Sequence, residues 1–245
     1  MAQYPRPTPE DYAYHREHQE YHKLENPLRD LILGGQDGLV NALGIILGVL
    51  AAGGSNHILV ATVLAASFAE SLSMGAVAYT SAMSQKDHYE AEKAKAKHEI
   101  EKYPAMEAEE VREIFEQKGF KGKVLDEIVD TITADKTIWL NTMVTEELQL
   151  QPVDTRSVLK SSVIVTIATG IGHLIPLLPF FITFGQSGLI ASVIVSAITL
   201  FAVGVYQALT LVGSWWKMGL KLVAIGLIAA FAGYLIATLF HVSAG

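Results

Sequence analysis

Residues 161–216 read SSVIVTIATGIGHLIPLLPFFITFGQSGLIASVIVSAITLFAVGVYQALTLVGSWW and contain no Asp, Glu, Lys or Arg. A membrane-crossing helix needs about 20 mostly apolar residues, so this stretch has room for two of them. Every Asp and Glu of the chain lies at or before Asp154, and beyond Lys160 the only Lys or Arg residues are Lys217 and Lys221. A segment of this kind needs lipid around it and indicates an integral membrane protein.

The hydropathy pattern predicts five membrane helices in all. The first of them is the weakest because it contains Asp37. Backbone groups in lipid must be hydrogen-bonded within their own segment, so these segments should be helices and the fold all-α. The five cover roughly residues 31–52, 57–83, 158–184, 188–213 and 218–240.

The segment between the second and third spans differs in kind, because it is dense in Glu, Lys and Asp with helical periodicity. The second membrane helix should continue into this segment until Pro104 breaks it. A short amphipathic helix closed by Gly119 should follow, and two more helices with apolar faces should run on toward Pro152. We therefore expect residues 85–156 to form a soluble helical module.

The positions of Lys and Arg predict the orientation in the membrane. They occur in an N-terminal arm, residues 1–29, in the 85–156 module, and in the corner between the last two spans. Basic loops face the cytoplasm, so these parts should be cytoplasmic and the C-terminus extracytoplasmic or lumenal. The membrane part then comprises residues 30–84, with helices one and two, and residues 157–241, with helices three to five.

Composition excludes several classes of function. The formal net charge of -7 argues against a nucleic-acid partner. The chain has no cysteine, so disulfides and thiolate chemistry are excluded and any metal must be held by oxygen, nitrogen or thioether groups. The polar N-terminus lacks the basic-then-apolar pattern of a removable signal.

Two carboxylates and a methionine within the apolar stretches are candidates for a cation path. Ionisable groups such as Asp37 and Glu70 are costly in a membrane unless they face a polar interior. Met74 lies one helical turn from Glu70, and a carboxylate beside a thioether suits a fairly soft divalent cation. The alternatives are that nearby glycines place Asp37 in a hydrated loop, and that Met74 only fills a packing gap.

In the soluble module, spacing selects a second candidate metal site. Two pairs of residues are one helical turn apart, and one further carboxylate lies near the end of the preceding helix. Together they would make an oxygen-rich site with one thioether, whereas the alternative is that they lie on the hydrated faces of charged helices. The five residues are Glu99, Glu107, Glu110, Met143 and Glu147.

Histidines form a third group of candidates. His15, His18 and His22 fall on one helix face, either as a low-affinity metal collector or as part of a helix at the membrane interface. His173 precedes Pro176 in a stretch where a helix should kink or end. Its ring can relay protons or simply pack against the kinked backbone.

Four motifs stand out by their order and spacing: LRDLILGGQDGLV at 28–40, SMGAVAYTSAMSQKDHY at 73–89, the 139–148 segment, and GIGHLIPLLPFF at 170–181. Together they resemble the vacuolar iron transporter family over nearly the whole chain. The resemblance implies a homodimer of five-helix subunits with the transport path between them and a metal-binding domain on the cytoplasmic side. It also implies proton-coupled export of Fe²⁺, sometimes Mn²⁺, across a vacuolar or bacterial plasma membrane.

By position, the resemblance assigns Asp37 and Met74 to the transport path, and it assigns all five candidates in the soluble module to the cytoplasmic ligands. Three positions depart from the family pattern. Ala96 stands where a further glutamate ligand is expected, and Val144 where a second methionine is expected. Ala66 occupies a position that is often Glu, and we hypothesise that Glu70 replaces this carboxylate from the next turn.

The resulting prediction is a transporter and not an enzyme. Cytoplasmic carboxylates capture the cation, which passes to Asp37, Glu70 and Met74 near the dimer axis and is released on the far side. A carboxylate among apolar helices can hold a proton when empty and release it when a cation binds. Fe²⁺ is the expected cargo, with Mn²⁺, Co²⁺ and Zn²⁺ as further candidates and no prosthetic group.

Two alternatives come from other classes of protein. One is a metal sensor that binds a cation without transporting it. The other is a membrane-anchored iron store or ferroxidase, although the chain lacks the Glu-x-x-His motif that di-iron carboxylate bundles use.

Overall fold

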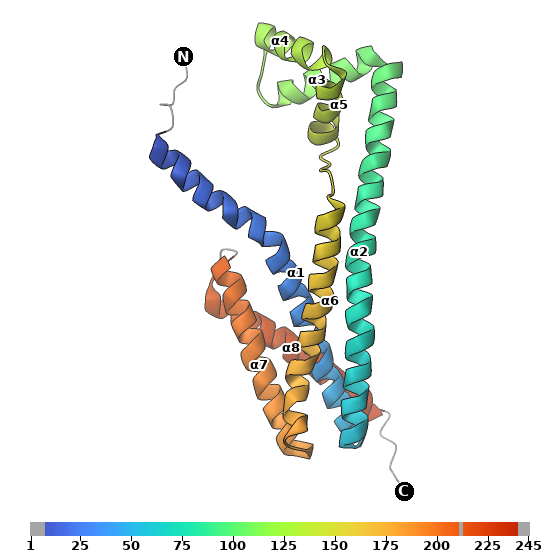
Figure 1. The fold of residues 1–245 in the computed structure, drawn as a ribbon, viewed down its shortest axis with the longest axis vertical. Coiled ribbons are helices and arrows are strands. Elements are labelled where there is room, and N and C mark those ends of the chain that lie inside the picture. The colour runs from blue at the N-terminus through green and yellow to red at the C-terminus, as the bar shows by residue number, and fades with distance from the viewer. Residues whose placement is uncertain (1–7, 211–212, 240–245) are drawn as a thin grey trace. The chain divides into compact units, whose positions relative to one another are not determined.

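The computed structural model describes residues 8–210 and 213–239, with side chains described in these ranges except at 11 and 15–27. The described residues form helices and connecting turns without a β-strand (Figure 1), which confirms the all-α prediction. By their contacts the residues divide into two compact units. Unit 1 combines Met1–Ala78 with Leu159–Gly245, and unit 2 is Tyr79–Val158.

Five helical segments of the described chain are long and apolar enough to cross a membrane, as predicted. The first candidate span, Leu28–Ala51, lies in α1 (Pro9–Ala51), and the second lies in α2 (Asn56–Lys102). The third comprises α6 (Thr155–Leu177) and a following 3₁₀ turn. The last two are α7 (Gly185–Thr210) and α8 (Trp215–Leu239).

Helix α1 is longer than the first predicted span, because it is continuous from Pro9 through the glycines around Asp37. The alternative of a hydrated loop at Asp37 is therefore wrong. The backbone of α1 satisfies its own hydrogen bonds through this region, which a loop in lipid could not do. His15, His18 and His22 lie outside the described side chains.

The connection between the third and fourth membrane segments differs from the predicted bounds. Pro176 lies inside α6, which ends at the next residue, Leu177. A 3₁₀ turn, Leu178–Phe181, follows. The predicted kink or helix end is thus confirmed, and the third span, Thr155–Phe181, begins and ends three residues earlier than the predicted 158–184. Residues 185–187 were expected to form a loop and instead form the first turn of α7, which Gly185 begins with a φ of 61°.

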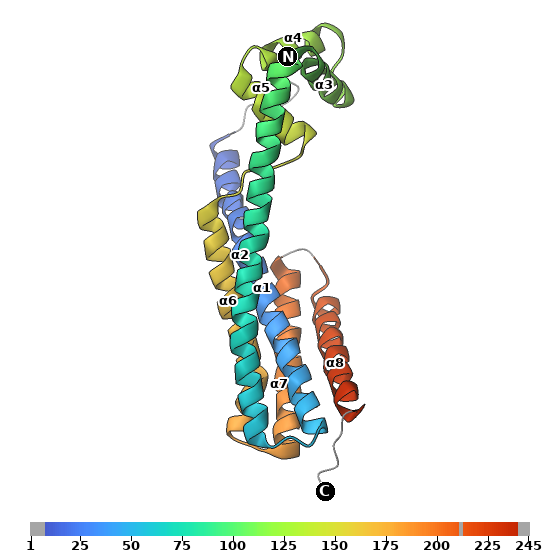
Figure 2. The same ribbon diagram turned by 90° about the vertical axis from the view of Figure 1, so that its right-hand side faces the viewer.

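Helix α7 shows how small side chains organise unit 1. Every fourth residue of this helix is buried, and most of these residues are small, whereas Ile190, Ile194 and Ile198 on the same helix are exposed. Small residues let membrane helices pack closely, and large apolar residues suit contact with lipid. Helices α1, α7 and α8 contact one another in this way (Figure 2). The buried residues of α7 are Gly188, Ser192, Ser196, Leu200, Gly204 and Ala208.

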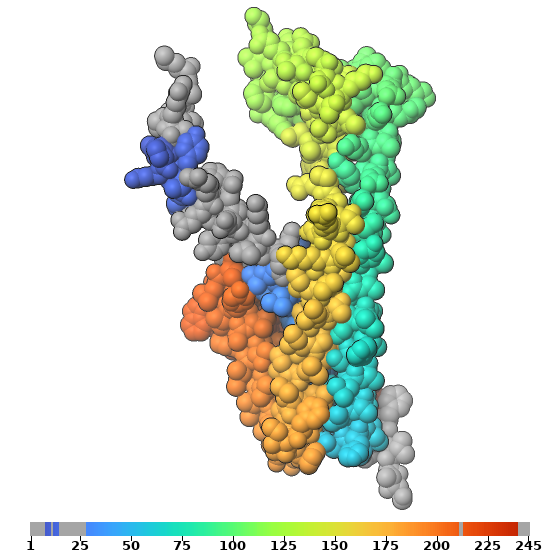
Figure 3. Space-filling model, viewed as in Figure 1, coloured from blue at the N-terminus to red at the C-terminus, as the bar shows by residue number. Residues whose placement is uncertain are grey.

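Helix α6 packs against both α1 and α2 at glycines. A Cβ atom on Gly172 would overlap the carbonyl oxygen of Gly35 and lie 3.0 Å from the amide nitrogen of Leu39. On α2, a Cβ atom on Gly75 would overlap the hydroxyl of Thr166. Figure 3 shows α6 and the first part of α2 in contact along one face. Glycine is thus required where the helices of unit 1 come closest.

Unit 2 is built from the end of α2 and short helices around one apolar core. The expected helix ends are confirmed, since α2 stops before Pro104 and Gly119 follows α3 with a φ of 97°. The short helices are α3 (Pro104–Gln117), α4 (Gly122–Thr133), α5 (Lys136–Thr142) and a π-helical turn, Met143–Glu147. The core residues are Ile100, Val111, Leu125, Val129, Ile132, Trp139 and Met143.

Replacing Gly172 with Ala should destabilise the protein by about 1–3 kcal/mol, because the new methyl group meets backbone atoms that cannot rotate away. Thermal unfolding of the purified protein in detergent measures this change. Gly35→Ala is the matched control, since its Cβ atom would lie 3.8 Å from the carbonyl oxygen of Ala168, an ordinary contact. Equal melting temperatures for the two variants would contradict the prediction.

Candidate functional site

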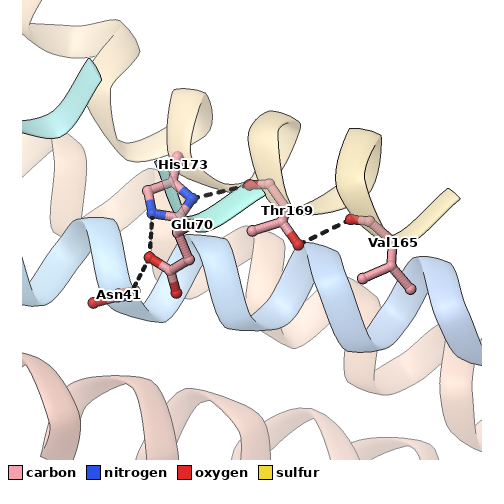
Figure 4. Close-up of polar contacts among 5 residues, drawn as sticks. All are labelled: Asn41, Glu70, Val165, Thr169 and His173. Carbon is pink, nitrogen blue, oxygen red and sulfur yellow. Dashed lines mark hydrogen bonds and ion pairs between the residues drawn. The ribbon is translucent and has the colours of Figure 1, made fainter. Parts of the chain in front are cut away.

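Three helices of unit 1 place polar side chains together at one point. Asn41 of α1 donates a hydrogen bond from its Nδ2 to Oε2 of Glu70 on α2. The same oxygen lies 3.0 Å from Nε2 of His173 on α6. Figure 4 shows the amide and the imidazole converging on this carboxylate. Glu70 is thereby held by two other helices, although it lies in a segment of membrane-helix character.

His173 is fully buried, with both ring nitrogens engaged. Its Nδ1 lies 3.0 Å from the carbonyl oxygen of Thr169, one turn earlier on α6. A carbonyl oxygen can only accept, so Nδ1 carries a hydrogen atom and donates it. Nε2 lies against Oε2 of Glu70, and since two bare acceptors would repel, the contact requires one proton, carried by either the imidazole or the carboxyl group. This arrangement fixes the orientation of the ring.

The position of the His173 ring depends on Gly38, the glycine of α1 that faces it. A Cβ atom on Gly38 of α1 would overlap the carbonyl oxygen of Thr169 and lie 2.7 Å from Nδ1 of His173. The absence of a side chain at this position leaves the space that the imidazole and its backbone partner occupy. The missing side chain at Gly38 thus allows both the close contact of α1 with α6 and the polar contacts of His173.

The side chain of Asp37 on α1 is exposed and lines a cavity of about 470 Å³. Asn41 lines the same cavity, and α8 contributes Ala229 and Gly233 to its wall. Asp37 is also within electrostatic reach of Glu70 and His173. The cavity, the two carboxylates and the imidazole are therefore neighbours within unit 1.

Met74 is the third residue of the predicted cation path. It is half-buried on α2, one turn beyond Glu70, and the adjacent Gly75 packs against α6. The structure thus brings Asp37 and Glu70 together with Asn41 and His173, and Met74 lies one helical turn beyond Glu70 on α2.

In unit 2, Glu107 is the buried member of the acidic group. It lies in the first turn of α3 with 7% of its surface exposed. Burial raises the pKa of Glu107 to about 7, and the neighbouring charges of Glu110, Glu99 and Glu147 add to the shift. These four predicted ligands therefore lie close enough to repel one another.

Lys95 partly offsets this repulsion. Its ammonium lies 3.9 Å from Glu99, one turn further along α2, and it lowers the pKa values of Glu107 and Glu147. Burial nevertheless raises the pKa of Glu147, with Glu110 as the next largest cause. The residues near Glu107 thus carry more negative than positive charge, which favours binding of a cation.

The predicted thioether ligand belongs to the core of unit 2. Met143 is fully buried beside Val111 and Trp139, and it begins the π-helical turn that also contains Glu147. Turns of this type are frequent at functional sites. The next residue, Val144, is also buried.

The described side chains include no set of three or more His, Asp or Glu residues arranged to hold a metal ion. The four glutamates of unit 2 are therefore electrostatic neighbours without a preformed coordination shell. His173 and Glu70 were each recognised from the sequence, but their contact was not, and Asn41 and Lys95 were missed. Asn41 lies one turn after Asp37, and Lys95 one turn before Glu99, so helical spacing from the predicted residues was the available signal.

Comparison with known proteins shows one family along most of the chain. Residues 28–238 match the VIT family. Vacuolar iron transporter 1 of Tulipa gesneriana is 30% identical over 233 residues, which is 94% of each chain. Vacuolar iron transporter 1 of Arabidopsis thaliana is 32% identical over 198 residues, covering 80% of this chain and 79% of the relative. The vacuolar iron transporter of Plasmodium falciparum (isolate 3D7) is 29% identical over 208 residues, covering 80% and 76%.

Glu107→Gln should stabilise unit 2 by about 1–3 kcal/mol at pH 8 without metal, and it should have little effect near pH 4. The raised pKa means that the folded state binds more protons than the unfolded state between pH 4.5 and about 7. The stability that Glu107 contributes is therefore complete below pH 4.5 and lost as the pH rises through about 7.

Hydrogen exchange of residues 104–148 in the full-length protein, measured across this pH range, tests the prediction. Glu113→Gln is the matched control, because Glu113 is an exposed carboxylate on the same helix. A stabilisation by Glu107→Gln that is the same at pH 4 and pH 8 would show that ionisation of Glu107 is not the cause.

Proposed function

Because this chain belongs to the VIT family, a family of transporters and not of enzymes, we propose that it carries Fe²⁺ out of the cytoplasm in exchange for protons. Relatives named vacuolar iron transporter match the chain over most of its length and suggest iron as the cargo. The observation that carries the proposal is that Asp37, which lines a cavity between apolar helices, lies within electrostatic reach of a second carboxylate, Glu70. Mn²⁺, Co²⁺ and Zn²⁺ are the other candidate cargoes.

The intramembrane carboxylates are the proposed transport site. Carboxylates inside membrane segments are rare and typically mark ion pathways. Asp37 is exposed to the cavity, while Glu70 is anchored between α1 and α6. We propose that the cation binds between them, with the thioether of Met74 as a softer ligand that favours Fe²⁺ over Mg²⁺ or Ca²⁺.

Glu70 takes the role that the family pattern gives to a residue one turn earlier. Ala66 occupies that earlier position and carries no ligand group. Glu70 is the carboxylate of α2 that contacts polar residues of α1 and α6, which supports the hypothesis that it replaces the missing one.

The acidic group of unit 2 is the proposed capture site on the cytoplasmic side. Glu107 and its three acidic neighbours repel one another when no cation is present, so a divalent cation would relieve the repulsion and displace the protons that a pKa near 7 retains. Met143 would add the thioether by a change in its packing. Ala96 and Val144 remove two ligand groups of the family pattern, and we expect weaker capture than a complete site would give.

Protons are the proposed counter-ions, because a carboxylate that binds a cation gives up its proton. Basic residues in the segments outside the spans favour a cytoplasmic position for unit 2. The small-residue stretches of the membrane helices suit close helix contacts, and we propose that two copies of the chain form a dimer with the path at its axis.

Uptake of Fe²⁺ into proteoliposomes with an imposed pH gradient tests the function. Native protein should show gradient-dependent uptake, and Asp37→Asn or Glu70→Gln should lower its rate at least about tenfold. Glu113→Gln is the control, because it removes an exposed carboxylate that is not one of the predicted ligands.

Neutralising Glu107 and Glu110 together should raise the KM for Fe²⁺, since it weakens capture without removing the membrane site. Metal binding by the native protein without uptake under any gradient would contradict transport and favour a metal sensor. Uptake that is independent of the pH gradient would contradict the proton coupling alone.

A further inference from the structure

The two contacts of Glu70 converge on a single oxygen atom. Nδ2 of Asn41 and Nε2 of His173 both reach Oε2, from α1 on one side and from α6 on the other (Figure 4). We propose that Asn41 and His173 form a clamp that positions the Glu70 carboxylate, and that this clamp sets the affinity of the membrane site for its divalent cation. The inference rests on the proposed function and names the residues that tune it.

The clamp orders the side chain of Glu70, which would otherwise be flexible. Ordering its side chain costs up to about 2 kcal/mol of rotamer entropy. A ligand that is already ordered does not incur this loss when the cation binds, so its affinity is higher. Two hydrogen bonds from different helices order the carboxylate before any cation arrives.

The imidazole is itself held rigidly. His173 has no exposed surface, its Nδ1 donates to Thr169, and the empty space at Gly38 accommodates the ring. Leucine or phenylalanine would fill a buried position in an apolar helix without any polar requirement. A histidine with one nitrogen on its own helix and the other on a carboxylate of α2 is suited to hold that carboxylate.

Asn41, the second member of the clamp, occupies a different environment. Asn41 is exposed on α1 and lines the cavity together with Asp37, one turn before it. Its amide thus connects the carboxylate of α2 with the space through which a cation would reach the site. One member of the clamp is buried and the other is accessible, so the two can be tested separately.

Three substitutions of His173 separate positioning from packing. Glutamine places its amide nitrogen near the position of Nε2 and can still reach Glu70. Asparagine places its amide near Nδ1 and can reach only Thr169. Phenylalanine fills the volume and donates nothing. If His173 had a purely structural role, the glutamine and asparagine variants would bind the cation equally well.

The experiment measures equilibrium binding of Co²⁺ to the purified full chain by visible absorption. Glu107→Gln and Glu110→Gln are present throughout, so that the cytoplasmic group does not dominate the signal. His173→Asn, His173→Phe and Asn41→Ala should each raise the Kd about tenfold, and His173→Gln should restore most of the affinity. Thr210→Val, which removes a hydroxyl bonded within α7, should change nothing.

Several results would overturn the clamp. These are an unchanged Kd in His173→Phe, equal effects of glutamine and asparagine, or no Co²⁺ bound by this background at all. In a Glu70→Gln background, His173→Phe should have no further effect, and additive losses would also overturn it. If the His173 variants do not fold, Asn41→Ala alone decides, because its side chain is exposed.

The outcome for transport is separate. Co²⁺ binding that follows the clamp without any Fe²⁺ uptake would contradict the proposed function and leave the clamp standing. Uptake that is intact in all clamp variants, with an unchanged KM, would contradict the clamp and leave the proposed function standing.

Discussion

The close approach of α6 to α1, where Gly172 and Gly38 let backbone meet backbone, is the contact on which the rest of unit 1 depends. In lipid, apolar side chains gain little by leaving one apolar surface for another, so association relies on close packing and on hydrogen bonds between helices. Glycine allows the close packing, and the close packing brings polar groups of different helices within hydrogen-bonding distance. With a side chain between the helices, the imidazole of His173 would lose its space, and with it the contact that holds Glu70.

The two units place carboxylates in opposite electrostatic situations. In unit 1 the Glu70 carboxylate already has two partners and a fixed direction. In unit 2 Glu107 is buried among other glutamates and keeps its proton up to a pH of about 7. A site of the first kind binds through preorganisation, and a site of the second kind binds through relief of repulsion and release of protons. These differences suit the selective membrane site and the pH-sensitive capture site that we propose.

Most of the fold could be predicted from the sequence, because its signals are local. Twenty apolar residues in a row predict a membrane helix wherever they occur, and Pro104, Gly119 and Pro176 end or alter helices through their own backbone restrictions. The alternative that placed Asp37 in a loop, which the structure contradicts, also rested on a local signal. The glycines around Asp37 are weak helix formers and suggested a loop, whereas in lipid the backbone has no alternative to the helix and α1 continues through them.

The candidate site was only partly predictable. Asp37 and Glu70 are recognisable from the sequence alone, because an ionisable residue in an apolar stretch is conspicuous whatever surrounds it. The partners of Glu70 are not, since His173 lies 103 residues away along the chain and Asn41 lies 29 residues away. The sequence by itself determined which segments are helical and apolar and where charge interrupts them. Only the tertiary structure decided which faces of those helices meet, because that depends on the shapes of side chains from distant segments fitting at glycines.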